Sequence, residues 1–337
     1  MTDREVRVLS FHAEYRCQNS GACCTANWPI PVEADRLARL QAGLATGALS
    51  AAVSHGLPPV DILPDAPPET PALLAVHEGR CVFHDAAGSC EIHKALGHDA
   101  LPLACRQFPR VCVTDPRGVS VTLSHYCPTA AGLLALDSSR AGGSILTNAG
   151  RFPPHAEYVG LDAARALPPL LRPGILMDWE SWWEIEGLSV EMLLSRGRDA
   201  GEALALLRGA VAALSDWSPG PVTLLDRVHQ AFEAPALKSA PDAGMLLADT
   251  ERSVPEALRD QFQWRTTHFG DDLTTRRFLA AHAFANWAIH LGAGLGSWLR
   301  SIETANAFLQ AGAGVRHADL VLRHLINHET APEHPRT

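Results

Sequence analysis

The stretch CQNSGACC at residues 17–24 places three of the chain's eight cysteines in one short segment. The other five follow by Cys127, and the remainder of the 337-residue chain contains none. Thiolates are soft donors that bind zinc, iron and iron–sulfur clusters. Separated groups of cysteines that folding can bring together therefore predict a metal or iron–sulfur centre in the first third of the chain.

Seven cysteines are predicted to surround this centre. They are Cys17, Cys23, Cys24, Cys81, Cys90, Cys105 and Cys127. Adjacent cysteines rarely bind one ion without backbone strain, so one of Cys23 and Cys24 could instead support the site, react, or serve a second site. His93, three residues after Cys90, is either an imidazole ligand or a surface or core histidine. Cys112 fits none of the groups, and we expect it to pack in the core.

The overall composition is that of a folded protein, with 47% apolar and 19% charged residues. A formal net charge of −9 argues against a nucleic-acid or anionic-membrane partner, because phosphate groups are bound by clustered Lys and Arg. The first residues lack the apolar core of a secretory signal, which makes the cytoplasm the expected compartment. In a reducing compartment, eight cysteines indicate ligands or redox thiols rather than disulfides.

The two parts of the chain differ in their pattern. Residues 73–127 are rich in loop signals, with one short alternating strand at 119–123. From residue 176 onward, Ala- and Leu-rich segments predict helices, the first of them capped by Asp178. We therefore expect a mainly α fold, with an irregular cysteine-rich metal-binding N-terminal module packed on an α-helical C-terminal part. The expected units are the cysteine module 1–136, a connecting segment 137–175 and an α-helical domain 176–330.

Three features of the helical part have ordinary structural interpretations. The apolar stretch 278–299 contains histidines, an asparagine and glycines, and is expected to be a buried helix or helix pair rather than a membrane span. GAGLG at 292–296 follows a helical pattern rather than a strand, which favours a helix break over a nucleotide or S-adenosylmethionine motif. The tryptophans at 179, 182 and 183 are expected to pack, and the histidines at 317, 324 and 328 to lie at a solvated helix end.

Several motifs nevertheless resemble a known family. CQNSGACC (17–24), CVF (81–83), CEIH (90–93) and CRQFP (105–109) are similar to the CxxCxxCC cysteine-cluster family, described as zinc- or iron-chelating. CCTANWPI (23–30), CRQFPR (105–110) and LSHYCPTAA (123–131) resemble its flagellin lysine-N-methylase branch. The resemblance covers roughly residues 11–135, and Ser20 stands where the family pattern has a cysteine.

This resemblance implies an iron–sulfur cluster, zinc or iron as the cofactor. Its methylase branch further implies an S-adenosylmethionine-dependent protein lysine N-methyltransferase acting on a flagellin-like protein. Such an enzyme needs a cavity of a few hundred cubic ångströms between the cysteine module and the helices for the methyl donor. The catalytic base cannot be assigned to any residue from the sequence. The alternative is a non-enzymatic zinc- or iron-chelating protein with a structural, storage or delivery role.

Overall fold

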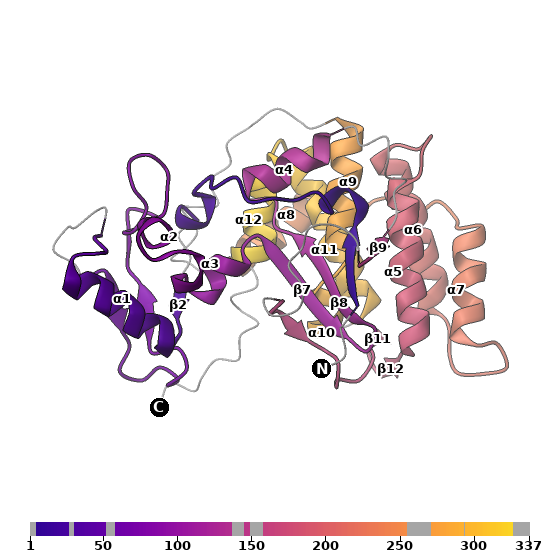
Figure 1. Ribbon diagram of the computed structural model, residues 1–337. Coiled ribbons are helices and arrows are strands. Elements are labelled where there is room, and N and C mark those ends of the chain that lie inside the picture. The colour runs from indigo at the N-terminus through magenta and orange to yellow at the C-terminus, as the bar shows by residue number, and fades with distance from the viewer. Residues whose placement is uncertain are drawn as a thin grey trace.

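The structure is a computed structural model that describes residues 5–26, 30–51, 58–136, 145–148, 158–254, 271–292 and 294–325. A small lobe built from the N-terminal third lies beside a larger body in which helices cover a sheet (Figure 1). Helices make up about 49% of the described part and strands about 15%, in several sheets. The prediction of a mainly α fold with an irregular cysteine module is therefore wrong, because the chain has a mixed α/β fold.

The larger body is organised around a five-stranded sheet with the strand order β10-β7-β8-β1-β9. Its strands are β1 (Val6–Leu9), β7 (Arg110–Asp115), β8 (Gly118–Leu123), β9 (Ile145–Thr147) and β10 (Leu161–Asp162). β7 and β8 form an antiparallel hairpin, and the N-terminal β1 pairs in parallel with β8, with Val6 opposite Val119. β9 is antiparallel to β1, and β10 is parallel to β7.

This sheet explains why the fold class was missed. β8 carries the alternation of apolar and polar residues that predicted a strand at 119–123, although all of its residues are buried, but one short strand does not reveal a five-stranded sheet. Its parallel neighbour β1 has only four residues and lies more than a hundred positions away in the sequence. A short strand with a distant partner leaves almost no local signal.

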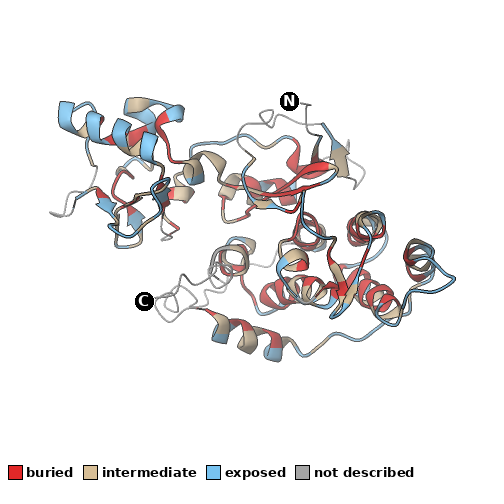
Figure 2. Ribbon diagram, turned by 90° about the horizontal axis from the view of Figure 1, so that it is seen from below, coloured by how far each residue is buried: buried red, intermediate tan, exposed pale blue. Residues whose placement is uncertain are grey.

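The helices of the body lie on one face of the sheet, and Figure 2 shows that their buried residues face inward. They are α4 (Pro128–Ala135), α5 (Trp179–Leu194), α6 (Ala200–Ser215), α7 (Leu224–Glu233), α8 (Ala243–Ser253), α9 (Asp272–Ala283), α10 (Ala288–Leu291), α11 (Leu295–Gln310), α12 (Val315–Leu320) and a π-helical turn (Val321–Leu325). β11 (Leu170–Arg172) and β12 (Ile175–Leu176) form a separate hairpin.

Local signals for these helices were predicted correctly. The Asp178 side chain accepts a hydrogen bond from the Ser181 backbone N–H and caps α5, as expected. The apolar stretch 278–299 forms parts of α9, α10 and α11, and the predicted break falls at Gly294, which has a φ of +95°. Trp182 is buried against Trp298, with ring centroids 5.9 Å apart, which confirms its packing role. In the described part of the chain, the helices lack the length and apolar content needed to cross a membrane.

The small lobe has its own sheet and its own buried core. β2 (Ile30–Val32), β4 (Ala72–Leu74) and β3 (Val60–Ile62) form an antiparallel sheet in that order, and β5 (Val76–His77) pairs with β6 (Arg80–Cys81). The helices are α1 (Ala34–Thr46), α2 (Glu91–Leu96) and α3 (Leu103–Gln107), with 3-10 turns at Ala22–Cys24 and His98–Ala100. A further 3-10 turn, Ser10–His12, follows β1 and belongs to the larger body. Val32, Leu40, Phe83 and Ile92 are among the residues that fill the core of this lobe.

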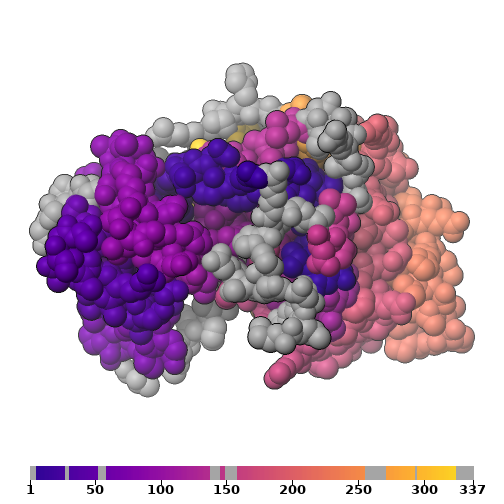
Figure 3. All heavy atoms as spheres, viewed as in Figure 1, coloured from indigo at the N-terminus to yellow at the C-terminus, as the bar shows by residue number. Residues whose placement is uncertain are grey.

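Residues of the N-terminal third contribute to both parts of the molecule. Leu9, Phe11, Val113 and Leu134 pack in the large cluster together with the helices, whereas the core of the small lobe runs from Cys24 to Leu101. In the space-filling view, the small lobe and the helices α5–α7 lie at opposite ends of the molecule (Figure 3). The expected division into 1–136, 137–175 and 176–330 stays a prediction, and part of the segment 137–175 lies outside the described residues.

Candidate functional site

A cavity of about 410 Å³ lies where the small lobe meets the end of the β7–β8 hairpin. Leu101 and the cysteines of the small-lobe core line one side of it, and Tyr15, Phe108 and Cys127 line the other. Six of the seven cysteines predicted as ligands line this cavity. They are Cys17, Cys23, Cys24, Cys90, Cys105 and Cys127. The fold therefore gathers thiols that lie as much as 110 positions apart in the sequence.

The thiols of the small lobe form an inner group. The Cys23 and Cys24 sulfurs are 3.9 Å apart, and the Cys24 side chain is also hydrogen-bonded to Cys90. Cys81, the seventh predicted ligand, is buried beside the cavity and interacts electrostatically with Cys23 and Cys90. Cys105 interacts electrostatically with the same thiols and with Cys81. The inner group thus joins a 3-10 turn, a β-strand, the start of α2 and the middle of α3.

Cys17 and Cys127 form an outer group around Tyr15. The Tyr15 hydroxyl lies 3.8 Å from the Cys127 sulfur and is also hydrogen-bonded to Cys17. Burial and the two neighbouring thiols raise the pKa of Tyr15 above its usual range. Cys127 is buried at the N-cap of α4, whereas Cys17 is exposed. The outer group therefore combines one buried thiol with one that is exposed to solvent.

The position of each thiol sets its acidity. The pKa of Cys90 is lowered to about 7, mainly by a hydrogen bond from Cys24. Burial opposes this shift, and the first backbone N–H groups of α2 assist it. Burial raises the pKa of Cys81 to about 12 and raises that of Cys105 well above its usual range. Without a cation, most of the inner thiols therefore stay protonated, and a bound metal ion would stabilise their thiolates.

Cys112 lies apart from these groups. It is fully buried against Val119 and Val121 in the sheet, and the Gln107 side-chain amide donates to its sulfur at 3.7 Å. The prediction that Cys112 packs in the core is confirmed. His93 lines the cavity, with its ring centroid 6.1 Å from that of His98, so both of its predicted roles stay open.

His84 is a residue of this region that the sequence did not single out. Its side chain is buried, and neither ring nitrogen has a hydrogen-bond partner among the residues that the structure describes. Its backbone forms a β-bridge with Cys90, and its ring packs so closely on Gly21 that a Cβ there would meet Nε2 at 2.5 Å. A buried imidazole without a partner is costly, so His84 joins the candidate donors. Its position between Cys81 and Cys90 was the only signal in the sequence.

The donor set suits a metal, but the donors are not yet arranged around one. Within the described ranges, no group of three or more His, Cys, Asp or Glu side chains stands ready to hold a metal ion. Sulfur with imidazole nitrogen is the ligand chemistry of zinc and of iron–sulfur clusters. Metal binding here would therefore require the thiols to move closer together, as in small domains whose sites form with the metal.

Of the other predicted positions, His317 is described and does not line the cavity. His317 is half-buried in α12, while the side chain of His324 and all of His328 fall outside the described residues, as do residues 27–29 of the CCTANWPI motif. Comparisons of the chain with models of protein families, with curated proteins and with solved structures found no match. The class of protein therefore rests on the residues and geometry of the chain itself.

Proposed function

We propose that this chain is a cysteine-cluster protein that binds an iron–sulfur cluster, zinc or iron between its small lobe and its larger body. The observation that supports this proposal is the gathering of six predicted ligands around one cavity, with the seventh buried beside it. Thiols have no packing reason to collect in this way, because a buried cysteine behaves as a small apolar residue that can pack anywhere, as Cys112 does.

The inner thiols are the residues that would hold the metal. Cys23, Cys24, Cys81, Cys90 and Cys105 exceed the four ligands of a tetrahedral zinc or of an iron–sulfur cluster. This surplus leaves room for one of Cys23 and Cys24 to act as a supporting thiol. Cys90, whose pKa is about 7, would release its proton most readily and so is the first expected ligand.

The proposal is tested by anaerobic purification followed by metal analysis, acid-labile sulfide analysis and a visible spectrum. We expect Cys90→Ala to lower metal affinity roughly tenfold or more, and the matched control Cys112→Ala to leave it unchanged. Colour with acid-labile sulfide identifies an iron–sulfur cluster, and colourless protein with bound zinc identifies a zinc site. A wild-type protein without metal, or equal metal content in both variants, would contradict the proposal.

A protein lysine N-methyltransferase is the second candidate, by resemblance to the flagellin lysine-N-methylase branch. The observation that favours it is a second cavity, of about 340 Å³, which lies in the size range of small-molecule sites. This cavity lies among the helices of the larger body, and not between the cysteine module and the helices as the sequence analysis expected. Lysine methylation depends mainly on orientation of a neutral amine toward the methyl donor. Methyl transfer from S-adenosylmethionine to flagellin lysines by metal-loaded protein is the test, and its absence favours the alternative of a chelator with a structural, storage or delivery role.

A further inference from the structure

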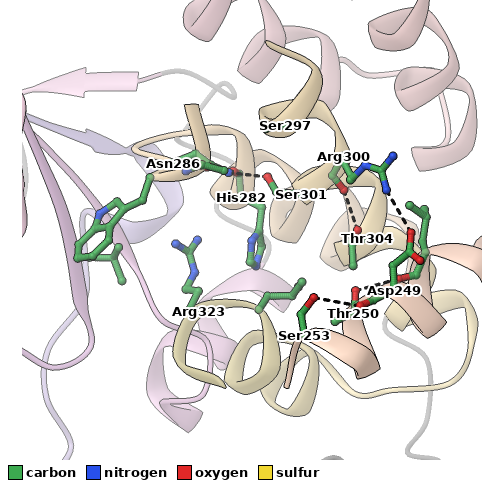
Figure 4. A pocket seen from close by; sticks show the side chains of 15 residues that line it. Asp249, Thr250, Ser253, His282, Asn286, Ser297, Arg300, Ser301, Thr304 and Arg323 are labelled. Atoms are coloured by element: carbon green, nitrogen blue, oxygen red, sulfur yellow. Dashed lines mark hydrogen bonds and ion pairs between the residues drawn. The ribbon is translucent and has the colours of Figure 1, made fainter. Parts of the chain in front are cut away.

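His84 differs from the other buried histidines that the structure describes. The His12 and His125 rings face each other, with their Nε2 atoms 3.0 Å apart. His282, which lines the second cavity (Figure 4), lies 3.4 Å from the Asp319 carboxylate. Both ring nitrogens of His84, in contrast, lack a hydrogen-bond partner among the described residues, although the residue is only 8% exposed. An imidazole buried in this way is costly unless a ligand binds it.

A short turn places His84 beside a predicted metal ligand. The segment is Cys81-Val82-Phe83-His84, and the His84 backbone N–H donates to the Cys81 carbonyl at 2.9 Å. Two ligands separated by two residues are a common arrangement in structural zinc sites. Cys81 is itself buried, so one turn of the small lobe presents both a buried thiol and a buried imidazole.

A second contact places the His84 side chain beside that of Cys90. The two residues form an antiparallel β-bridge. The backbone hydrogen bonds next to this bridge, both 2.9 Å long, join the residues on either side of the pair and not His84 to Cys90. In this non-hydrogen-bonded type of pair, the two side chains project from the same face of the ladder, with Cβ atoms roughly 4.5 to 5.5 Å apart. The imidazole therefore lies next to the thiol that we expect to bind the metal first.

The third contact is with the 3-10 turn that carries Cys24. Gly21 precedes this turn with a φ of +70°, and the Cys24 backbone N–H donates to its carbonyl at 2.9 Å. A Cβ on Gly21 would lie 2.5 Å from His84 Nε2, so glycine is needed for the ring to lie this close to the turn. The Cys24 side chain is in turn hydrogen-bonded to Cys90. The three segments around His84 therefore carry Cys24, Cys81 and Cys90.

His93 fits the same role less well. It follows Cys90 by three positions, but it is exposed, and its ring centroid lies 6.1 Å from that of His98. Water can satisfy an exposed imidazole, so its position requires no ligand, whereas the burial of His84 has no such compensation. The structure therefore favours His84 over the histidine that the sequence singled out.

We propose that His84 is a nitrogen ligand of the metal, in a site completed by the thiolates of Cys24, Cys81 and Cys90. This inference rests on the proposed function and specifies the metal. Three thiolates with one imidazole are a typical ligand set of structural zinc, whereas most iron–sulfur clusters are held by four cysteines. The side chains still have to move closer around the ion, since no group of three donors in the described ranges stands ready to hold it.

X-ray absorption at the zinc edge of the zinc-loaded, full-length protein tests this inference. We expect sulfur and nitrogen in the first shell in a ratio of three to one, with the outer-shell scattering that a rigid imidazole ring produces. Zinc surrounded by sulfur alone, or failure of the protein to bind zinc, would overturn the inference. Neither result by itself overturns the proposed function, because an all-cysteine zinc site or an iron–sulfur cluster would still agree with it.

Variants identify the imidazole. His84→Ala should lose the imidazole signal and bind zinc at least roughly tenfold more weakly, since even changes beside a metal ligand can cost that much. His93→Ala is the matched control in the same cavity, and it should keep both the signal and the affinity. His84→Cys should regain affinity, with a fourth sulfur in the first shell, which a purely structural role of His84 would not produce.

The variants can also contradict the assignment. An imidazole signal that is retained in His84→Ala, or lost in His93→Ala, would assign the nitrogen to another histidine and overturn the inference. The spectrum of the wild-type protein requires no substitution, so it decides the presence of an imidazole ligand even if His84→Ala does not fold.

Discussion

At the scale of single residues, burial controls the protonation of the histidines in the body of the protein. His290 in α10 packs near the rings of Trp179 and Trp182, with centroids 6.3 and 6.5 Å away. Loss of hydration in this apolar setting lowers the pKa of His290 to about 4, with only weak opposition from Asp115. The folded protein therefore favours the neutral imidazole.

This depressed pKa predicts a loss of stability in acid. In the unfolded chain His290 has its usual pKa of 6.5. As the pH falls from 6.5 toward 4, the unfolded chain therefore gains a proton that the folded protein does not, and the free energy of unfolding decreases. The loss for this residue is on the order of 3 kcal/mol of unfolding free energy at pH 4. Urea unfolding at pH 7 and pH 4 should show a smaller drop for His290→Gln than for wild type. The exposed His229→Gln is the control, and an identical drop in all three proteins would refute this assignment.

At the scale of secondary-structure elements, the β7–β8 hairpin holds the body together. The N-terminal strand β1 runs beside β8, and the Val119 N–H donates to the Glu5 carbonyl at 2.8 Å. Gly118 begins β8 with a φ of +132°, and a Cβ on it would lie 2.2 Å from the Glu5 carbonyl oxygen. Arg117 in the turn bonds to Asp115 of β7 and to Glu186 of α5, at 2.9 and 3.0 Å, which ties the sheet to the helices.

Gly118→Ala should therefore destabilise the fold by roughly 3 kcal/mol, because the added methyl group meets backbone that cannot move without breaking the β1–β8 pairing. Gly187→Ala in α5 is the matched control, since a Cβ added there would meet none of the described neighbouring atoms within 4 Å. It should leave stability unchanged or raise it by up to about 1 kcal/mol. Chemical unfolding of both variants measures the difference, and equal stability would show that β8 does not need glycine there.

The sequence correctly predicted helix caps and breaks, which depend on neighbouring residues. It did not predict contacts between residues that lie far apart in the chain. The Asp178 cap and the break at Gly294 were found because their signals lie within one helical turn. Asp319 was not, because its partners Ser124 and His125 lie almost two hundred positions earlier in the chain. Thiol chemistry alone selected the seven cysteines around the cavity. His84 was missed because a histidine in a turn is unremarkable until its burial is known.

At the scale of the whole molecule, the two lobes meet at the cysteine cavity. The inner thiols belong to the small lobe, whereas Cys127 and Phe108 extend from the end of the β7–β8 hairpin and the start of α4. A metal bound by the inner thiols would stabilise the small lobe, whose own apolar core is limited to a single cluster. The cavity among the helices lies within the larger body, and none of these thiols lines it.

The central claim is that sulfur atoms of this cavity bind a metal. X-ray absorption at the edge of the metal in anaerobically purified protein tests it most directly, because the surrounding shell reports the ligand type. The account predicts a dominant shell of sulfur ligands, at about 2.3 Å if the metal is zinc. This sulfur shell should be lost or depleted in the Cys90→Ala variant and retained in Cys112→Ala. A metal surrounded only by nitrogen and oxygen ligands, or a sulfur shell unchanged by Cys90→Ala together with Cys105→Ala, would contradict the account.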